Sequence, residues 1–199
     1  MKILSLRVIS TITLSLLTLN LTNCSSQNKI LDLAGDSVPE WVVDPSVSDG
    51  IGGAGIASPS KGGLKFQIPV AELDAKADIA SRIQSNISRV SKVALRSGAV
   101  NENDDVEQFF SQATKEVIKD QRLLGVKRDK MYRGKDGTLY IHMTMSEKDY
   151  TKYLDVLENS MIAKAKMSQL SRNNINKTQE AVKEIFDELE KERKETPLD

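Results

Sequence analysis

The sequence predicts an α+β fold, with a small, mostly antiparallel sheet of about three strands covered by long amphipathic helices and followed by a C-terminal helical extension. Three observations predict it. Apolar residues recur at three- and four-residue steps over residues 70–94 and again over residues 150–189, which is the period of a helix. They alternate at two-residue steps over residues 139–145, which is the period of a strand. The predicted elements do not alternate between strand and helix, as they would in a protein with a parallel sheet.

The composition excludes several classes of protein. The 199 residues include 28 basic and 28 acidic side chains, one His and one Cys. Because the formal net charge is zero, there is no basic excess to neutralise phosphates, and we expect no nucleic-acid partner. A single Cys cannot form an intramolecular disulfide. One His and one Cys are too few ligands for a typical zinc site, so we expect no metal and no cofactor.

Residues 1–23 are typical of a secretory signal peptide. Lys2 and Arg7 provide a positive start, and residues 8–21 are apolar but too short and too rich in hydroxyl groups to span a hydrocarbon core of about 30 Å. This stretch leads into the motif LTNC, which ends at Cys24, the only cysteine. The motif resembles the lipobox of bacterial lipoproteins, in which the Cys sulfur is joined to diacylglycerol and the chain is cut before it. We therefore predict lipidation at Cys24; an ordinary signal peptide and a membrane anchor are the alternatives.

Lipid on Cys24 would hold the mature chain on a membrane. Loss of the signal peptide leaves 26 basic and 28 acidic side chains, so we expect little attraction to anionic headgroups and attachment through the acyl chains. Ser25 and Ser26 follow the Cys without an Asp, which by analogy with sorting in well-studied diderm bacteria favours the outer membrane. Residues 24–38 are mostly polar, and we expect them to form a flexible, lipidated tether.

Residues 39–69 are rich in proline and glycine. Pro39 and Pro45 bracket an apolar piece with the only Trp, Trp41, and predict an extended lead-in that is not helical, with Trp41 as an anchor over the edge of the core. Residues 50–55 fit the spacing GxGxxG, but no helix opens within the motif, which argues against a nucleotide site. A short strand from about residue 51 to 57 is favoured instead, its glycines allowing close packing beneath a helix. The stretch that follows, up to Pro69, is predicted to be a loop.

Two helices are predicted next. The first has an apolar face and a solvated charged face, and we do not interpret Asp74 and Asp78 on the latter as a catalytic pair. Ala71 and Ala75 are small enough for a sheet or helix to approach closely. The second helix is predicted to begin near Asn103 or Asp104. The residues predicted to face the core are Val70, Leu73, Ala77, Ala80, Ile83, Ile87, Val90 and Ala94 in the first helix, and Val106, Phe109, Phe110, Ala113, Val117 and Ile118 in the second.

A hairpin and two further helical segments complete the chain. Residues 124–132 and 138–145 flank an Asp-Gly turn and predict antiparallel strands, with His142 on the more polar face as a plain surface histidine. Residues 150–161 carry an aromatic and aliphatic stripe that we expect to cover the sheet. A last charged segment has Ile175, Thr178, Val182, Ile185, Phe186 and Leu189 at helical spacing. This stripe needs cover, from the domain itself or from a partner chain or second copy.

The order of these features resembles the LPP-twenty lipoprotein family of bacterial membrane-associated proteins of about 20 kDa. The matching features are the lipobox at Cys24, the PEWV lead-in at residues 39–42, the glycine-rich segment 52–57, the Ala-rich helix and the hairpin strand that contains Leu139. The resemblance covers roughly residues 24–157. It implies a cell-envelope lipoprotein with a small α+β domain, of which some relatives serve flagellar or cell-surface assemblies. The family supplies no catalytic residues, so an enzyme is not expected.

We therefore divide the chain into the signal peptide, the tether at residues 24–38, an LPP-twenty-like domain at residues 39–160 and a charged helical extension at residues 161–199. The expected function is that of a lipid-anchored, outer-membrane component with a non-enzymatic structural or protein-interaction role. The alternative is a periplasmic lipoprotein that binds a small ligand in a groove between sheet and helix, near Trp41 and the glycine loop.

Overall fold

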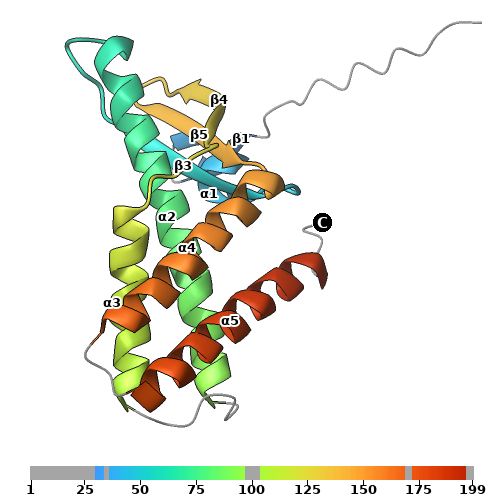
Figure 1. Cartoon of the computed structure of the whole chain (residues 1–199). Helices are drawn as coiled ribbons and strands as arrows, with labels where there is room; N and C mark the ends of the chain where they lie inside the picture. Colours follow the sequence, from blue (N-terminus) through green and yellow to red (C-terminus); the bar gives the residue numbers. More distant parts are fainter. Residues whose placement is uncertain (1–29, 34–35, 97–103, 169–171, 196–199) are drawn as a thin grey trace, which may run out of the picture.

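The α+β fold class is confirmed by a computed structural model, which describes residues 30–33, 36–96, 104–168 and 172–195. The strands are β1 (Ile30–Leu33), β2 (Asp36–Pro39), β3 (Ile51–Ala57), β4 (Lys127–Arg133) and β5 (Leu139–Met145). The helices are α1 (Glu40–Val43), α2 (Leu64–Arg96), α3 (Asp104–Asp120), α4 (Glu147–Met167) and α5 (Arg172–Glu195). The sheet lies at one end of the molecule, and the helices extend from it to the other end (Figure 1).

The main sheet is antiparallel, with the strand order β3-β5-β4. The predicted strand at residues 51–57 and the predicted hairpin are both confirmed. In the hairpin Tyr132 is opposite Tyr140, and Gly137 takes the positive φ of +88° that the tight turn needs. Leu139, Ile141, Met143 and Met145 of β5 are buried on the face that α2 covers, because alternate residues of a strand point to one face.

Helix α2 lies unusually close to the edge strand β3. A Cβ atom at Gly55 would stand 2.0 Å from the carbonyl oxygen of Ala71, and one at Gly53 would stand 2.7 Å from that of Ala75. Both alanines are completely buried. The predicted packing of small residues against a glycine strand is therefore confirmed.

The same contact covers the open edge of β3. The backbone N–H groups of Ala54 and Ile56 point away from β5, and they donate to Asp78 Oδ2 at 3.1 Å and to Asp74 Oδ2 at 2.9 Å. The prediction that both carboxylates merely face solvent is wrong. They satisfy edge amides that would otherwise be free to pair with another strand.

Two predictions for α2 are also wrong. The helix begins at Leu64, six residues before the expected start, and contains Pro69 in its second turn. It is held there by the buried side-chain amide of Gln67, which donates to the carbonyl oxygens of Ser58 at 3.0 Å and Gly137 at 2.9 Å. In addition, three residues predicted to face the core are exposed: Val70 at 56%, Leu73 at 71%, and Ala77. Only small residues fit against the glycines of β3, so Ala71 and Ala75 face the sheet. The helix is consequently oriented with Val70 and Leu73 towards solvent.

The opposite face of the sheet is covered by the N-terminal elements. Strands β1 and β2 form an antiparallel two-stranded sheet within the segment predicted to be a flexible tether. Residues Glu40–Val43 form one helical turn, so the prediction of a non-helical lead-in is wrong. Pro39 provides extended geometry only at the N-cap, where its missing N–H costs no helical hydrogen bond. Trp41 is buried, as predicted.

Below the sheet, the helices form a ring in which α2 contacts α3, α3 contacts α4, α4 contacts α5 and α5 returns to α2 (Figure 1). The stripe of α4, with Tyr153 and Leu157, packs on its neighbouring helices and not mainly on the sheet, because α2 already occupies that face. The stripe of α5 is covered by the protein itself, with Val182 and Ile185 fully buried. The expected division at residue 160 falls within α4. Among the described helices, none is long and apolar enough to cross a membrane.

We predict that Gly55→Ala destabilises the fold by about 1–3 kcal/mol, because the added methyl group must displace the backbone of α2. Chemical denaturation followed by circular dichroism measures this. Ile56→Thr on the same strand is the matched control: its side chain is 47% exposed, and a change within about 0.5 kcal/mol is expected. Equal stability of the Gly55→Ala variant and the wild type would contradict the close contact.

A second prediction concerns Tyr153, whose hydroxyl group is buried with no hydrogen-bond partner among the described residues. Burial raises the pKa of Tyr153 to about 12. The unfolded chain, with a tyrosine pKa of about 10, ionises first, so ionisation of this group leaves the stability unchanged below pH 10 and lowers it as the pH rises from 10 towards 12. Tyr153→Phe should stabilise the protein by about 1 kcal/mol at pH 7 and reduce the loss of stability between pH 10 and 12.

The control for this prediction is Tyr132→Phe, because the Tyr132 hydroxyl group donates to the Ser37 carbonyl oxygen at 3.1 Å. That variant should lose stability at pH 7. If Tyr153→Phe were the less stable of the two, the buried hydroxyl group would have a partner.

Candidate functional site

The predicted lipidation site, Cys24, lies outside the described residues. Its chemistry therefore stays a prediction from the sequence. Among the described residues, the most prominent candidate for a binding site is a groove on the helical side of the sheet.

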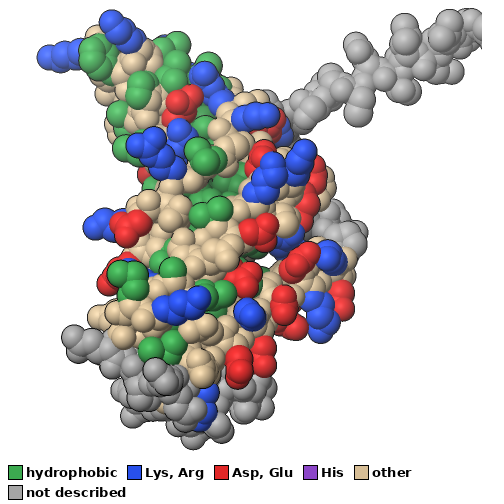
Figure 2. Space-filling view, in the orientation of Figure 1, with side chains coloured by type: hydrophobic (Ala, Val, Ile, Leu, Met, Phe, Trp, Pro, Cys, Tyr) green, Lys and Arg blue, Asp and Glu red, His purple; other side chains and the backbone are tan. Residues whose placement is uncertain are grey.

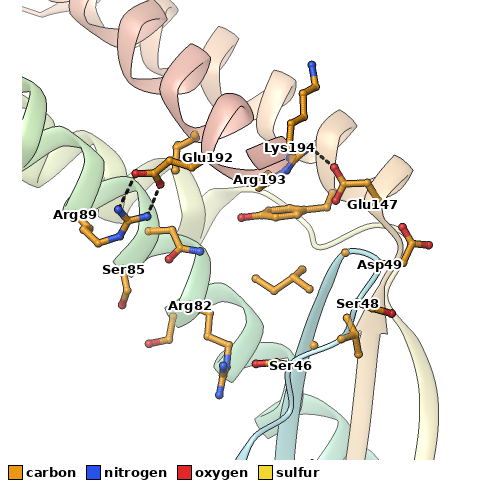
Figure 3. Close-up of a pocket in the computed structure, with 18 residues that line it drawn as sticks. Ser46, Ser48, Asp49, Arg82, Ser85, Arg89, Glu147, Glu192, Arg193 and Lys194 are labelled. Carbon is orange, nitrogen blue, oxygen red and sulfur yellow. Dashed lines mark hydrogen bonds and ion pairs between the residues drawn. The ribbon is translucent and has the colours of Figure 1, made fainter. Parts of the chain in front are cut away.

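The groove has a volume of about 680 Å³, within the range typical of small-molecule sites. One wall is the loop at residues 46–50 with the start of β3, and another is the middle of α2. The remaining walls are the first turn of α4 and the last turns of α5 (Figure 3). It therefore lies at the point where the C-terminal helix returns to the sheet.

An ion pair between Arg89 on α2 and Glu192 on α5 crosses one end of the groove (Figure 3). The two guanidinium nitrogens donate to the two carboxylate oxygens at 2.9 and 2.5 Å, which is the bidentate geometry that arginine favours. The hydrogen bonds from Arg89 lower the pKa of Glu192. Because about half of the Arg89 side chain is exposed, the pair contributes less than about 1 kcal/mol to stability.

Arg193 forms the more enclosed end of the groove. Its side chain is only 17% exposed, and its guanidinium group donates to Glu147 and, at 2.9 Å, to the Thr151 hydroxyl group. The same group lies 4.9 Å from the centre of the Tyr150 ring, a cation–π contact that joins α5 to α4. Tyr150 lines the groove but is buried, and this burial raises the pKa of its hydroxyl group.

The groove is polar but has no excess of one charge that is free to bind. Arg82 is paired with Asp78 at 3.0 Å and Lys194 with Glu190 at 2.7 Å, and Arg89 and Arg193 are paired as described. The remaining polar lining consists mainly of hydroxyl and amide groups, from Ser46, Ser48, Ser81, Ser85 and Asn86. Such a lining suits a neutral or zwitterionic polar molecule that exchanges hydrogen bonds with hydroxyl groups, more than a strongly charged one.

His142 lies elsewhere and is not the surface histidine that was predicted. Its side chain is 1% exposed, because α1 and the Pro45 segment cover the face of β5 that alternation assigned to solvent. The ring stands 5.5 Å from Trp41, and its two nitrogens lie 2.9 Å from the Pro45 carbonyl oxygen and 3.0 Å from Asp129 Oδ2. A carbonyl oxygen only accepts hydrogen bonds, so Nε2 donates to it. With both nitrogens engaged, His142 fastens the N-terminal segment to the sheet.

Metal ligands do not gather anywhere in the described parts of the chain: no group of three or more His, Cys, Asp or Glu side chains is placed to hold an ion. The acidic side chains that line the groove, Asp49, Glu147 and Glu192, lie on different elements, and the latter two are engaged by arginines.

The groove was not predicted at its observed position. The expected ligand groove lay near Trp41 and the glycine-rich stretch; of these, only Gly50 and Gly52 line the observed groove. Arg89 and Glu192 are 103 residues apart, so their pairing depends on how the helices pack. The sequence signal for the groove is weak, because arginine and glutamate near the end of a helix, such as Glu192 and Arg193, usually lie on a solvent-exposed face.

Comparison with known proteins does not assign the chain to a family. No protein-family model matches it, and no curated protein is significantly similar to it. The resemblance to the LPP-twenty lipoprotein family therefore stays a prediction from the residues.

We predict that Arg193→Met destabilises the fold by about 1–2 kcal/mol, because it leaves Glu147 without its partner while keeping the apolar length of the side chain. Arg89→Met is the matched control and should cost less than about 1 kcal/mol, since that pair is more exposed. Urea denaturation of both variants measures the difference. A greater loss for Arg89→Met would mean that the two pairs are ranked wrongly.

Proposed function

We propose that the protein is a cell-envelope lipoprotein that is anchored through Cys24 and acts by binding, without catalysis. The observation that carries the proposal is the position of the only cysteine, directly after a short apolar stretch with a basic start. Two or three acyl chains at that residue would anchor the protein, whereas one chain anchors only marginally. By analogy, Ser25 and Ser26 favour the outer membrane.

The arrangement of the described residues supports this proposal. The chain that follows Cys24 enters the fold at β1 after five residues, so an acyl group at Cys24 would hold the folded part close to the lipid. The one histidine is engaged at both ring nitrogens. The exposed polar face of α5 and the polar groove are the surfaces on which a protein partner or a second copy could be bound.

A second candidate function is the binding of a small polar ligand, favoured by the 680 Å³ groove and its hydroxyl-rich lining. Trp41 does not line the groove, so its emission would not report a ligand there. Ser85→Trp places a reporter on the wall formed by α2. A change in its emission on addition of cell-envelope extract, compared with the wild type, would favour this candidate, and equal emission of both would weigh against it.

We predict that the mature protein from its native host begins at Cys24 and carries acyl groups, because cleavage of a lipobox occurs before the lipidated Cys. Intact-mass analysis shows both properties at once. The Cys24→Ala variant should lose the acyl mass and leave the membrane fraction on a high-salt wash, which removes proteins held by charge alone, while a Ser25→Ala control should keep both the acyl mass and the membrane attachment. If the Cys24→Ala protein were cut at the same site and remained in the membrane fraction, the anchoring proposal would be wrong.

A further inference from the structure

One end of the molecule combines exposed apolar and basic side chains. There the loop before α2 and its first turn contribute Lys61, Leu64, Lys65 and Phe66, all exposed, and Phe66 is 59% exposed. The last residue of β4, Arg133, and the turn that follows it, with Lys135, add two exposed basic side chains at the same end. We call these six residues the tip. Figure 2 shows hydrophobic and basic side chains side by side at the end where α2 begins.

The two parts of the tip form one fixed surface. Gln67 lies in the first turns of α2 and donates to the carbonyl oxygens of Ser58 and Gly137, which belong to the loop before α2 and to the hairpin turn. The side chain of Pro59 lies near Gly137 as well, since a Cβ atom there would be 3.5 Å from it. The basic groups of the turn are therefore held beside the apolar start of the helix.

The apolar part of the tip continues along α2. Val70 and Leu73 follow Phe66 at spacings of four and three residues, so all three lie on one side of the helix. Each is more than half exposed, and this side faces away from the sheet. Exposed apolar side chains that gather on one side of a helix are typical of a contact site for a membrane or a protein.

The positive charge of the tip indicates which kind of surface it would bind. Its four basic side chains are accompanied within the two loops by a single acid, Asp136, whose carboxylate accepts hydrogen bonds from the Thr138 N–H at 3.0 Å and from the Thr138 hydroxyl group. The overall charge near zero conceals this local excess of three positive charges. Apolar side chains flanked by lysine and arginine suit an anionic lipid surface, in which the rings and aliphatic groups enter and the cations meet phosphates.

The length of the chain outside the described residues points to the same occupant. Five residues lie between Cys24 and Ile30, so the two are at most about 20 Å apart along the chain. Strand β2 is fastened to the same end of the sheet, because the Tyr132 hydroxyl group donates to the Ser37 carbonyl oxygen and Tyr132 is next to Arg133. A lipid on Cys24 would therefore keep the tip within reach of the bilayer.

We propose that the tip is a membrane-docking surface, in which Leu64 and Phe66 enter the interface and Lys61, Lys65, Arg133 and Lys135 bind anionic headgroups. For its proximity to the bilayer the proposal rests on anchoring at Cys24, but the attraction of the tip to anionic lipid does not require the acyl chains. Docking would fix the orientation of the domain, with the hairpin turn at the membrane and the ring of helices directed away from it.

The first test uses the mature chain, residues 24–199, with Cys24→Ala, so that no acyl group contributes. Co-sedimentation with vesicles of phosphatidylglycerol and phosphatidylcholine should show binding at low salt that weakens as salt is added. Lys61→Glu with Lys65→Glu should weaken it at least about tenfold, since each basic residue contributes about 1 kcal/mol near an anionic surface. The matched control, Lys148→Glu with Lys152→Glu on α4, makes the same charge change beyond the other end of β5 and should bind within about twofold of the parent. Binding that is absent, or equally weakened in both, would overturn the proposal.

The second test uses the lipidated chain in vesicles that contain brominated lipid. Phe66→Trp should be quenched strongly, whereas Val93→Trp, an exposed position near the far end of α2, should be quenched no more than the wild type with its buried Trp41. Equal quenching at positions 66 and 93 in a chain that stays with the vesicles would overturn docking and leave the anchor intact. Loss of the lipidated chain from the vesicles at high salt, with the first test positive at low salt, would refute the anchor alone. A dimer in light scattering that Phe66→Ser dissociates would assign the tip to a second copy and overturn the proposal.

Discussion

The contact between α2 and β3 determines where the other elements of this protein can lie. At Gly53 and Gly55 the backbone of the helix stands where a side chain of the strand would be, so the two elements pack without an intervening layer. This close approach shortens the distance between the helix backbone and the edge of β3. The short side chains of Asp74 and Asp78 can therefore accept hydrogen bonds from the edge amides of β3. Packing and hydrogen bonding therefore depend on the same two glycines.

This contact also connects the groove with the tip. Helix α2 has 33 residues, about 50 Å at the usual rise per residue, and only part of it covers the sheet. Its first turn forms the tip beside the hairpin turn, and its middle forms a wall of the groove with Arg82 and Arg89. Because both lie on one continuous helix fixed to the sheet, an anchored and docked molecule would present its groove and α5 at a defined distance from the bilayer.

Several features could be predicted from the sequence because they depend on local periodicity. The strand at residues 51–57, the hairpin and the four long helices follow from alternation, helical spacing and turn residues. The rotation of α2 could not be predicted from hydrophobicity, since Val70 and Leu73 are more apolar than Ala71 and Ala75, yet the smaller pair is buried. The buried face of α2 could instead have been predicted from Gly53 and Gly55 of β3, because a helix that packs this closely on them can place only small residues such as alanine there.

Other features depend on contacts between distant residues. His142 is buried because Pro45, 97 residues earlier, returns to the face of β5 that alternation assigned to solvent. The groove exists because Arg193 and Glu192 at the end of α5 reach α4 and α2. The basic tip could not be predicted from the net charge, which is zero for the whole chain. Its side chains come from two segments about 70 residues apart, which Gln67 joins in the fold.

Amide hydrogen exchange at Ala54 and Ile56, followed residue by residue by NMR, tests the central contact most directly. Both amides lie on the open edge of a sheet, where unpaired N–H groups exchange rapidly with solvent. If Asp78 and Asp74 bind them as described, both exchange slowly in the wild type, and Asp78→Ala accelerates Ala54 more than Ile56. Rapid exchange of both amides in the folded wild type would contradict the contact on which the arrangement of groove and tip depends.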